Sequence, residues 1–102
     1  MMTMKLGILL TTPPSHQNTH SVIEISKASR QKGHEVGIFM MADGVYNILH
    51  QPLLDLEKEG VSLSMCAHNA SQRGLDRVEA VLWGSQYDLA VLANECDRFL
   101  TF

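Results

Sequence analysis

The sequence lacks any long apolar run, and this absence bounds where the chain can reside. No run approaches the ~20 residues that a helix needs to cross a bilayer. The apolar stretch at residues 6–10 is too short for the core of a signal peptide, and it leads into Thr-Thr-Pro-Pro without a small-residue cleavage site. We therefore expect a cytoplasmic protein with no membrane partner.

Basic clusters are also missing. The formal net charge is −3, and no run of like charges occurs. A protein that binds nucleic acid normally carries a basic patch or stripe that contacts phosphates. The composition therefore argues against nucleic acid and anionic lipid as direct partners.

Cysteine is scarce, with only Cys66 and Cys96 in the chain. In a reducing cytoplasm two cysteines so far apart are better interpreted as free thiols than as a disulfide. They form neither a redox CxxC motif nor a zinc-ribbon spacing. The five histidines are scattered, and Cys66 with His68 lacks a third ligand. We expect no metal and no cofactor.

Glycine is absent from the loop that follows the first predicted strand, TTPPSHQNTH. A nucleotide-binding α/β domain would be the obvious rival interpretation of this chain. However, neither a dinucleotide fingerprint nor a P-loop occurs anywhere in it. The two prolines also remove backbone N–H donors that a phosphate would need. Nucleotide binding is therefore disfavoured.

The composition and length of the chain predict one globular domain over residues 1–102. The hydrophobic fraction is 45% and the charged fraction 19%, which is ordinary for such a domain and unlike a disordered chain. The length is too small for two domains.

Apolar runs predict strands at residues 4–10, 35–40, 61–65 and 97–102. A helix is expected from residue 18 or 19 to residue 32, with Gly33 after its end. Its inward positions would be Val22, Ile25, Ala28 and Ser29. A second helical region starts near Val45 and is interrupted at Pro52, and its last piece ends at Gly60.

Two segments leave alternatives open. Residues 77–83 could be a helix, or a short helix followed by a strand at residues 79–83. Ser85 with Asp88 forms a capping-box pattern that favours a helix to residue 96. The apolar run at residues 88–93 is also compatible with a strand.

Alternating strands and helices with short links predict a mostly parallel sheet covered by helices on both faces. Functional groups in such sheets gather at the carboxyl ends of the strands. Three segments follow predicted strands and should form this rim: residues 11–14, residues 42–44 and the segment beginning at Cys66.

Cys66 is the candidate nucleophile at this rim. If residues 67–74 open as a helix, unpaired backbone N–H groups and the helix dipole favour the thiolate, which is the reactive form. His68 is awkwardly placed to act as its base. A thiol that needs only accessibility suits sulfur transfer, in which a persulfide is accepted and handed on. The alternative is a buried cysteine that acts as a small hydrophobe.

Several motifs resemble the DsrE/TusD family (DsrE/DsrF family) of intracellular sulfur-relay proteins. The resemblance runs nearly end to end. The specific segments are a Thr-x-Pro-type loop after the first strand, Gly33-His34, Asp43-Gly44-Val45-Tyr46-Asn47, Cys66-Ala67-His68-Asn69-Ala70-Ser71-Gln72-Arg73-Gly74, and Cys96-Asp97-Arg98 followed by Phe102.

This resemblance implies a three-layer α/β/α sandwich with about five strands that assembles into trimers or hexamers, with itself or with paralogues. It also implies a sulfurtransferase or sulfur carrier in which Cys66 holds a persulfide and passes it to a partner protein. The pathway would be tRNA thiolation or dissimilatory sulfur oxidation. The alternative is a non-catalytic assembly subunit of a DsrE-type oligomer.

Other residues are expected to have structural roles. Asp43, Gly44 and Tyr46 would shape the rim as turn and packing residues. Arg73 could lie near the thiolate or simply end a helix. Cys96 is expected to be a buried structural thiol on a helical stripe with Leu89, Leu92 and Ala93. Large apolar side chains suited to subunit contacts are Trp83, Tyr87, Leu100 and Phe102.

Overall fold

The computed structural model describes residues 3–102, so the first two residues of the predicted domain lie outside the described part. Its strands are β1 (Lys5–Leu10), β2 (Glu35–Met40), β3 (Ser62–Cys66), β4 (Val81–Gly84) and β5 (Arg98–Thr101). The α-helices are α1 (Asn18–Gln31), α2 (Gln51–Leu54), α3 (Ala67–Gln72) and α4 (Gln86–Glu95), and the 3₁₀ helices are η1 (Ala42–Leu49) and η2 (Asp55–Glu59).

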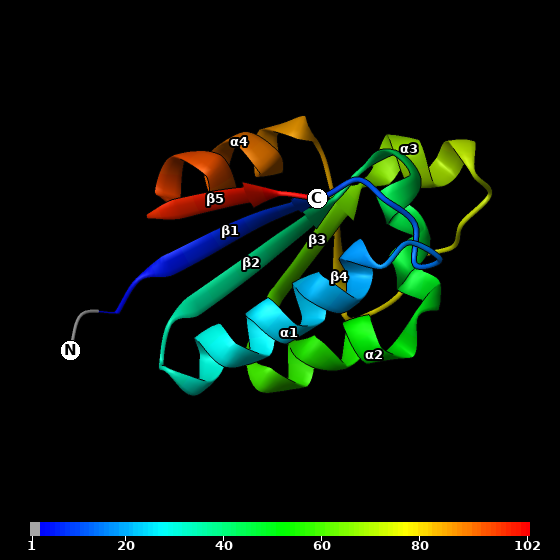
Figure 1. Ribbon diagram of the computed structural model, residues 1–102. Coiled ribbons are helices and arrows are strands. Elements are labelled where there is room, and N and C mark those ends of the chain that lie inside the picture. The colour runs from blue at the N-terminus through cyan, green and yellow to red at the C-terminus, as the bar shows by residue number, and fades with distance from the viewer. Residues whose placement is uncertain (1–2) are drawn as a thin grey trace.

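The five strands form one parallel sheet in the order β4-β3-β2-β1-β5. Parallel neighbours need crossover connections, which the intervening helices supply. β4 and β5 lie at opposite edges, so the connection that contains α4 spans the whole sheet (Figure 1). The predicted three-layer α/β/α fold is confirmed.

The two faces of the sheet are covered unequally. α1 and α2 lie on one face and α4 lies on the other (Figure 1). α4 packs closely on the central strands because these carry glycine. A Cβ at Gly37 would lie 2.9 Å from Leu92 Cδ1, and one at Gly7 would lie 3.0 Å from Cys96 Sγ.

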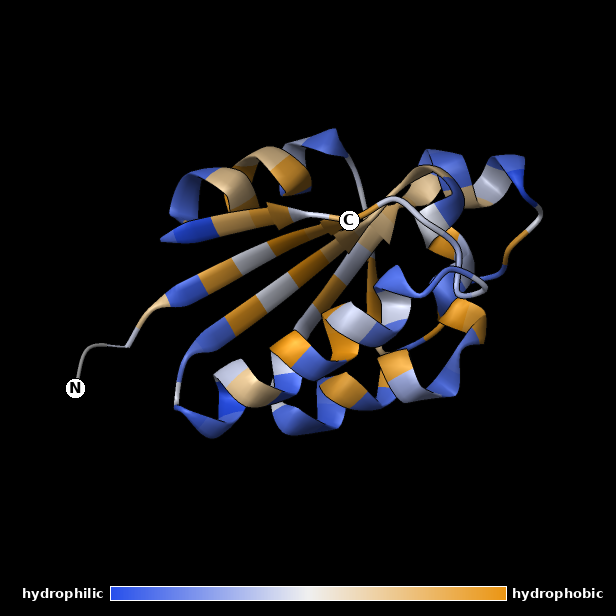
Figure 2. Cartoon of the chain, viewed as in Figure 1, coloured by the Kyte–Doolittle hydropathy of each residue, from blue (hydrophilic) through white to orange (hydrophobic). Residues whose placement is uncertain are grey.

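The core lies mainly between the sheet and the helices on the α1 side. Figure 2 shows apolar residues along the strands and many hydrophilic residues along α1. By contrast, α4 has no fully buried residue and β5 is exposed along its length. The fully buried side chains include Ile8, Leu10, Val22, Ile38, Leu53, Leu56 and Met65.

The buried stripe of α1 differs from the prediction. Thr19, Val22, Ile23 and Ser26 are buried, whereas Ala28 is exposed. The reason is that α1 packs against α2 and η2 as well as against the sheet. A second packing surface on one side rotates the buried stripe, and local spacing alone does not reveal that neighbour.

The structure decides between the alternatives for residues 77–83 and for the segment that follows Ser85. Residues 77–80 contain no helix, and β4 follows them and pairs with β3 at Leu63↔Val81. α4 is a helix with the predicted capping box, in which Ser85 and Asp88 bond reciprocally. The second helical region divides into η1, α2 and η2, with Pro52 in the first turn of α2.

Candidate functional site

Cys66 is the last residue of β3 and the N-cap of α3. The strand fixes its backbone, and the first turn of the helix directs one N–H group, that of Asn69, back toward the sulfur. Sγ accepts a hydrogen bond from the Asn69 N–H at 3.5 Å. The residue is only 5% exposed, so the sulfur lies within the rim and not on an open surface.

Asn69 connects this thiol to the neighbouring strand end. Its Oδ1 accepts a hydrogen bond from the backbone N–H of Ala42 at 2.8 Å. Ala42 opens η1 after β2 and has a φ of 52°, which is uncommon for a residue with a Cβ. The same asparagine therefore contacts Sγ through its backbone and η1 through its side chain.

Arg73 makes a second connection between α3 and η1. Its Nε and Nη2 lie 3.1 and 3.0 Å from Asp43 Oδ1, and its Nη1 donates to the Asn69 carbonyl at 3.0 Å. The guanidinium also lies over the Tyr46 ring, 5.9 Å from its centroid. Arg73 thus ends the helix, as one of the two predictions has it, and also ties the helix to the rim.

The loop after β1 joins the same rim through Asn47. This side chain belongs to η1 and is fully buried, and both of its polar atoms have hydrogen-bond partners. Its Nδ2 donates to the Thr12 and Gly44 carbonyls at 2.9 and 2.8 Å, and its Oδ1 accepts from Thr19 Oγ1 at 2.7 Å. The Asn47 and Asn69 side chains therefore join the segments that follow β1, β2 and β3, and these are the three segments that the sequence predicted to form one rim.

The remaining predicted residues separate from the thiol. His68 is exposed on α3, in line with a solvated helix residue. Cys96 is the C-cap of α4 and precedes β5, so it lies at the amino end of the strands, opposite Cys66. Cys96 is half-buried and not fully buried as predicted, because it follows the last turn of α4, a helix that has no fully buried residue. Ala93 on the predicted stripe is exposed. Neither thiol forms a disulfide within the described chain.

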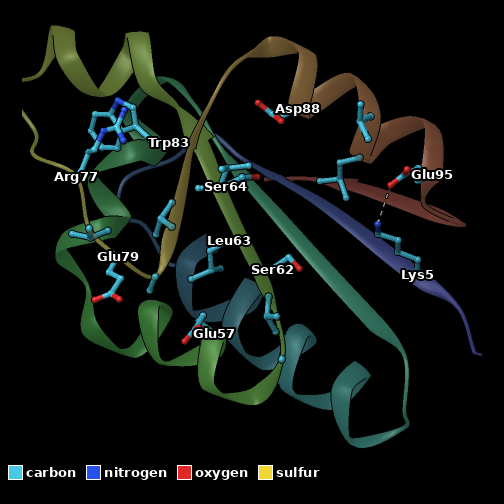
Figure 3. A pocket seen from close by; sticks show the side chains of 18 residues that line it. Lys5, Glu57, Ser62, Leu63, Ser64, Arg77, Glu79, Trp83, Asp88 and Glu95 are labelled. Carbon is cyan, nitrogen blue, oxygen red and sulfur yellow. Dashed lines mark hydrogen bonds and ion pairs between the residues drawn. The ribbon is translucent and has the colours of Figure 1, made fainter.

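A groove of about 910 Å³ lies between α4 and the β3–β4 edge. Figure 3 shows Ser62, Ser64 and Asp88 around it, with the Lys5–Glu95 ion pair at 3.2 Å on one side. In its wall the Arg77 guanidinium carbon lies over the Trp83 ring, 5.8 Å from the ring centroid. Cys66 does not line this groove, so the candidate nucleophile and this hollow are separate features.

Asn69 and Asn47 are the site residues to which sequence reasoning gave no role. The capping position of Cys66 identifies Asn69 as the residue whose N–H it receives. No local pattern, however, reveals side-chain contacts with Ala42 or Thr12, because these residues are distant in sequence.

Within residues 3–102, no group of three or more His, Cys, Asp and Glu side chains could hold a metal ion. None of the helices in this range is long and apolar enough to cross a membrane.

Comparisons with known proteins place these features in a family. One curated relative is the uncharacterized protein MJ0989 of Methanocaldococcus jannaschii, which is 27% identical over 97% of this chain and 100% of its own length. The crystal structure of YchN from E. coli superposes with a TM-score of 0.80 at 22% identity, covering 99% of this chain and 100% of YchN.

A second solved structure shares the fold more distantly. It is the conserved protein of unknown function BT1422 from Bacteroides thetaiotaomicron, with a TM-score of 0.72 and 16% identity over 96% of this chain and 94% of its own. The sequence model of the DsrE/DsrF-like family matches residues 4–102, which is nearly the whole chain. This protein belongs to the DsrE/DsrF-like family.

Proposed function

We propose that this protein is a sulfur carrier that accepts sulfane sulfur as a persulfide on Cys66 and passes it to a cysteine of a partner protein. Its family supports a role related to sulfur relay. The single observation that carries the proposal is the placement of Cys66 at the carboxyl end of β3, where the Asn69 N–H donates to Sγ.

The chemistry requires only thiolates and persulfides. The Cys66 thiolate attacks the outer sulfur of a donor persulfide, the donor S–S bond breaks, and the donor departs as a thiolate. In the second step an acceptor thiolate attacks the outer sulfur of the Cys66 persulfide, which restores the Cys66 thiolate. Each step forms one S–S bond and breaks one, so no external oxidant or reductant is consumed.

The position of Cys96 supports a mechanism with one thiol. Cys96 lies at the opposite end of the strands from Cys66, and its Sγ donates to the Ala93 carbonyl at 3.5 Å. An intramolecular disulfide requires Cα atoms within about 7 Å. Cys96 therefore does not serve as a resolving thiol for Cys66 within one subunit.

Sulfur loading tests the proposal directly. The protein is incubated with a low-molecular-weight polysulfide, and intact mass together with peptide mapping locates any added sulfur. We expect added sulfur on Cys66, loss of loading in Cys66→Ser, and unchanged loading in Cys96→Ser. A Cys66→Ser variant that still loads and delivers sulfur contradicts the proposal.

The exposed α4–β5 surface favours one alternative, a non-catalytic assembly subunit. Tyr87 is 75% exposed on α4, and Phe99 and Leu100 on β5 are also exposed. An assembly subunit would use this surface for oligomer contacts and would gain no sulfur on Cys66. The loading experiment therefore separates the two functions.

A further inference from the structure

We propose that Asn69 is a positioning residue for the Cys66 thiol. The proposal rests on the sulfur-carrier function above and concerns the same rim. Asn69 offers its backbone N–H to Sγ, while its side chain holds the helix that bears this N–H against the start of η1.

α3 is a short helix. A helix of six residues forms too few internal hydrogen bonds to be stable by itself. Its orientation must therefore come from tertiary contacts. Ala70 supplies one, because it is fully buried in the core. The polar contacts to the neighbouring rim come from Asn69 and Arg73, which bond to Ala42 and Asp43.

The two polar contacts differ in strength. The Arg73–Asp43 pair lies near the surface, with the Asp43 side chain 60% exposed, and such pairs contribute little. The Asn69–Ala42 hydrogen bond is shorter, at 2.8 Å, and partly buried. It also ends on a residue held at positive φ, a conformation that persists only where the surroundings enforce it.

These observations make the Asn69 side chain the main polar contact that sets the position of its own N–H. If Oδ1 is removed, α3 can shift against η1, and the hydrogen bond to Sγ at 3.5 Å lengthens. Hydrogen bonds to charged atoms are roughly twice as strong as neutral ones, so a longer bond removes stabilisation from the charged sulfur that reacts.

The test compares Asn69→Leu with the wild type. Leucine has a similar size but no oxygen for the Ala42 N–H. We expect the rate of polysulfide loading at Cys66 to fall about tenfold, and the rate of alkylation by iodoacetamide to fall in parallel, because both reactions lose the same hydrogen bond to the charged sulfur. Peptide mapping restricts both rates to Cys66. Alkylation does not require sulfur-relay chemistry, so it tests positioning even if the wild type loads no sulfur.

Matched variants exclude a general loss of stability. Ile23→Val shortens a buried side chain in α1 and should lower Tm without changing either rate. Gln72→Ala removes the weak 3.4 Å partner of Asn69 Nδ2 and should change neither rate nor Tm. Asn69→Asp keeps an oxygen for the Ala42 N–H, and at high salt, which screens its added charge, it should recover most of both rates.

Each outcome of these measurements either supports or overturns the positioning role of Asn69. Slower reaction in Asn69→Leu with recovery in Asn69→Asp supports positioning. Unchanged or faster reaction in Asn69→Leu overturns it, and faster reaction would mean that Asn69 only restricts access to the sulfur. Equal slowing in Ile23→Val would also overturn it, because the effect would then follow stability alone.

Discussion

Gly44 has the least room of the glycines at the rim. A Cβ there would collide with the Leu10 carbonyl oxygen and would lie 3.0 Å from Thr11 Cα. The carbonyl cannot easily move away, because it accepts a hydrogen bond from the Met41 N–H at 3.1 Å. The contact between the β1 loop and η1 thus depends on the absence of a side chain at one position.

Gly44→Ala should therefore lower the free energy of unfolding by about 3 kcal/mol, the upper range for forcing extra atoms into packed structure. Urea denaturation measures this change. Gly74→Ala is the control, since Gly74 has no neighbouring atom within 4 Å and only its φ of +69° opposes a side chain. It should lose about 1 kcal/mol. Equal losses in the two variants would contradict the collision.

At the scale of elements, α4 depends on its cap more than a buried helix would. It packs closely on the sheet but has no fully buried residue, so core packing stabilises it less than it stabilises α1. Its first turn is fixed by the Tyr87 N–H to Ser85 Oγ bond at 3.2 Å and the Ser85 N–H to Asp88 Oδ2 bond at 2.8 Å.

We expect Ser85→Ala to destabilise α4 by about 1 kcal/mol, the typical cost of losing an N-cap. Amide hydrogen exchange should accelerate in the first turn of α4 while β1, β2 and β3 keep their protection. Ser71→Ala, at an exposed position in α3, is the matched control and should leave α4 unchanged. Uniform acceleration across the sheet would show instead that α4 is coupled to global unfolding.

The elements that sequence could predict are those with strong local signals. β1 and β2 are short apolar runs bounded by turn residues, and the Ser85–Asp88 box marks the start of α4. β4 was one of two alternatives for residues 77–83, because an apolar run this short is compatible with a helix and with a strand. Its pairing with β3 is a tertiary contact that short apolar runs do not encode.

The site also has features that local sequence predicts and features that depend on tertiary contacts. The placement of Cys66 was predictable, because a strand end followed by a polar helical segment is a local pattern. The Asn69–Ala42 and Asn47–Thr12 hydrogen bonds were not, since each joins segments that only the folded sheet brings together.

At the scale of the whole molecule, the last third of the chain leaves apolar surface uncovered. Leu82 is 58% exposed, and Tyr87 and the β5 side chains Phe99 and Leu100 are exposed as well. Of the residues predicted for subunit contacts, Trp83 and Phe102 are half-buried. Aromatic and aliphatic side chains of this kind are typical of interface cores.

We predict that the protein is an oligomer built through this surface, which in a trimer or hexamer would be repeated by symmetry. Light scattering at micromolar concentration should give a mass above that of the monomer, and Tyr87→Asp combined with Leu100→Asp should reduce it. Glu24→Lys, an exposed charge reversal on α1, is the control. A monomeric wild type would contradict the prediction.

β4 and β5 follow each other in the chain but lie at opposite edges of the sheet. This arrangement determines the order in which the sheet can be completed during synthesis. Residues 5–66 contain β1, β2 and β3, which can pair as soon as they leave the ribosome. One edge of β1 stays unpaired until β5 is made, and β5 is the last of the five strands to be synthesised. Hydrogen bonds between Asp97 and Lys5 and between Thr11 and Phe102 then join the two ends of the β1–β5 pair. A nascent chain therefore carries an open β1 edge, and such edges can pair with other chains. Residues 97–102 end that exposure.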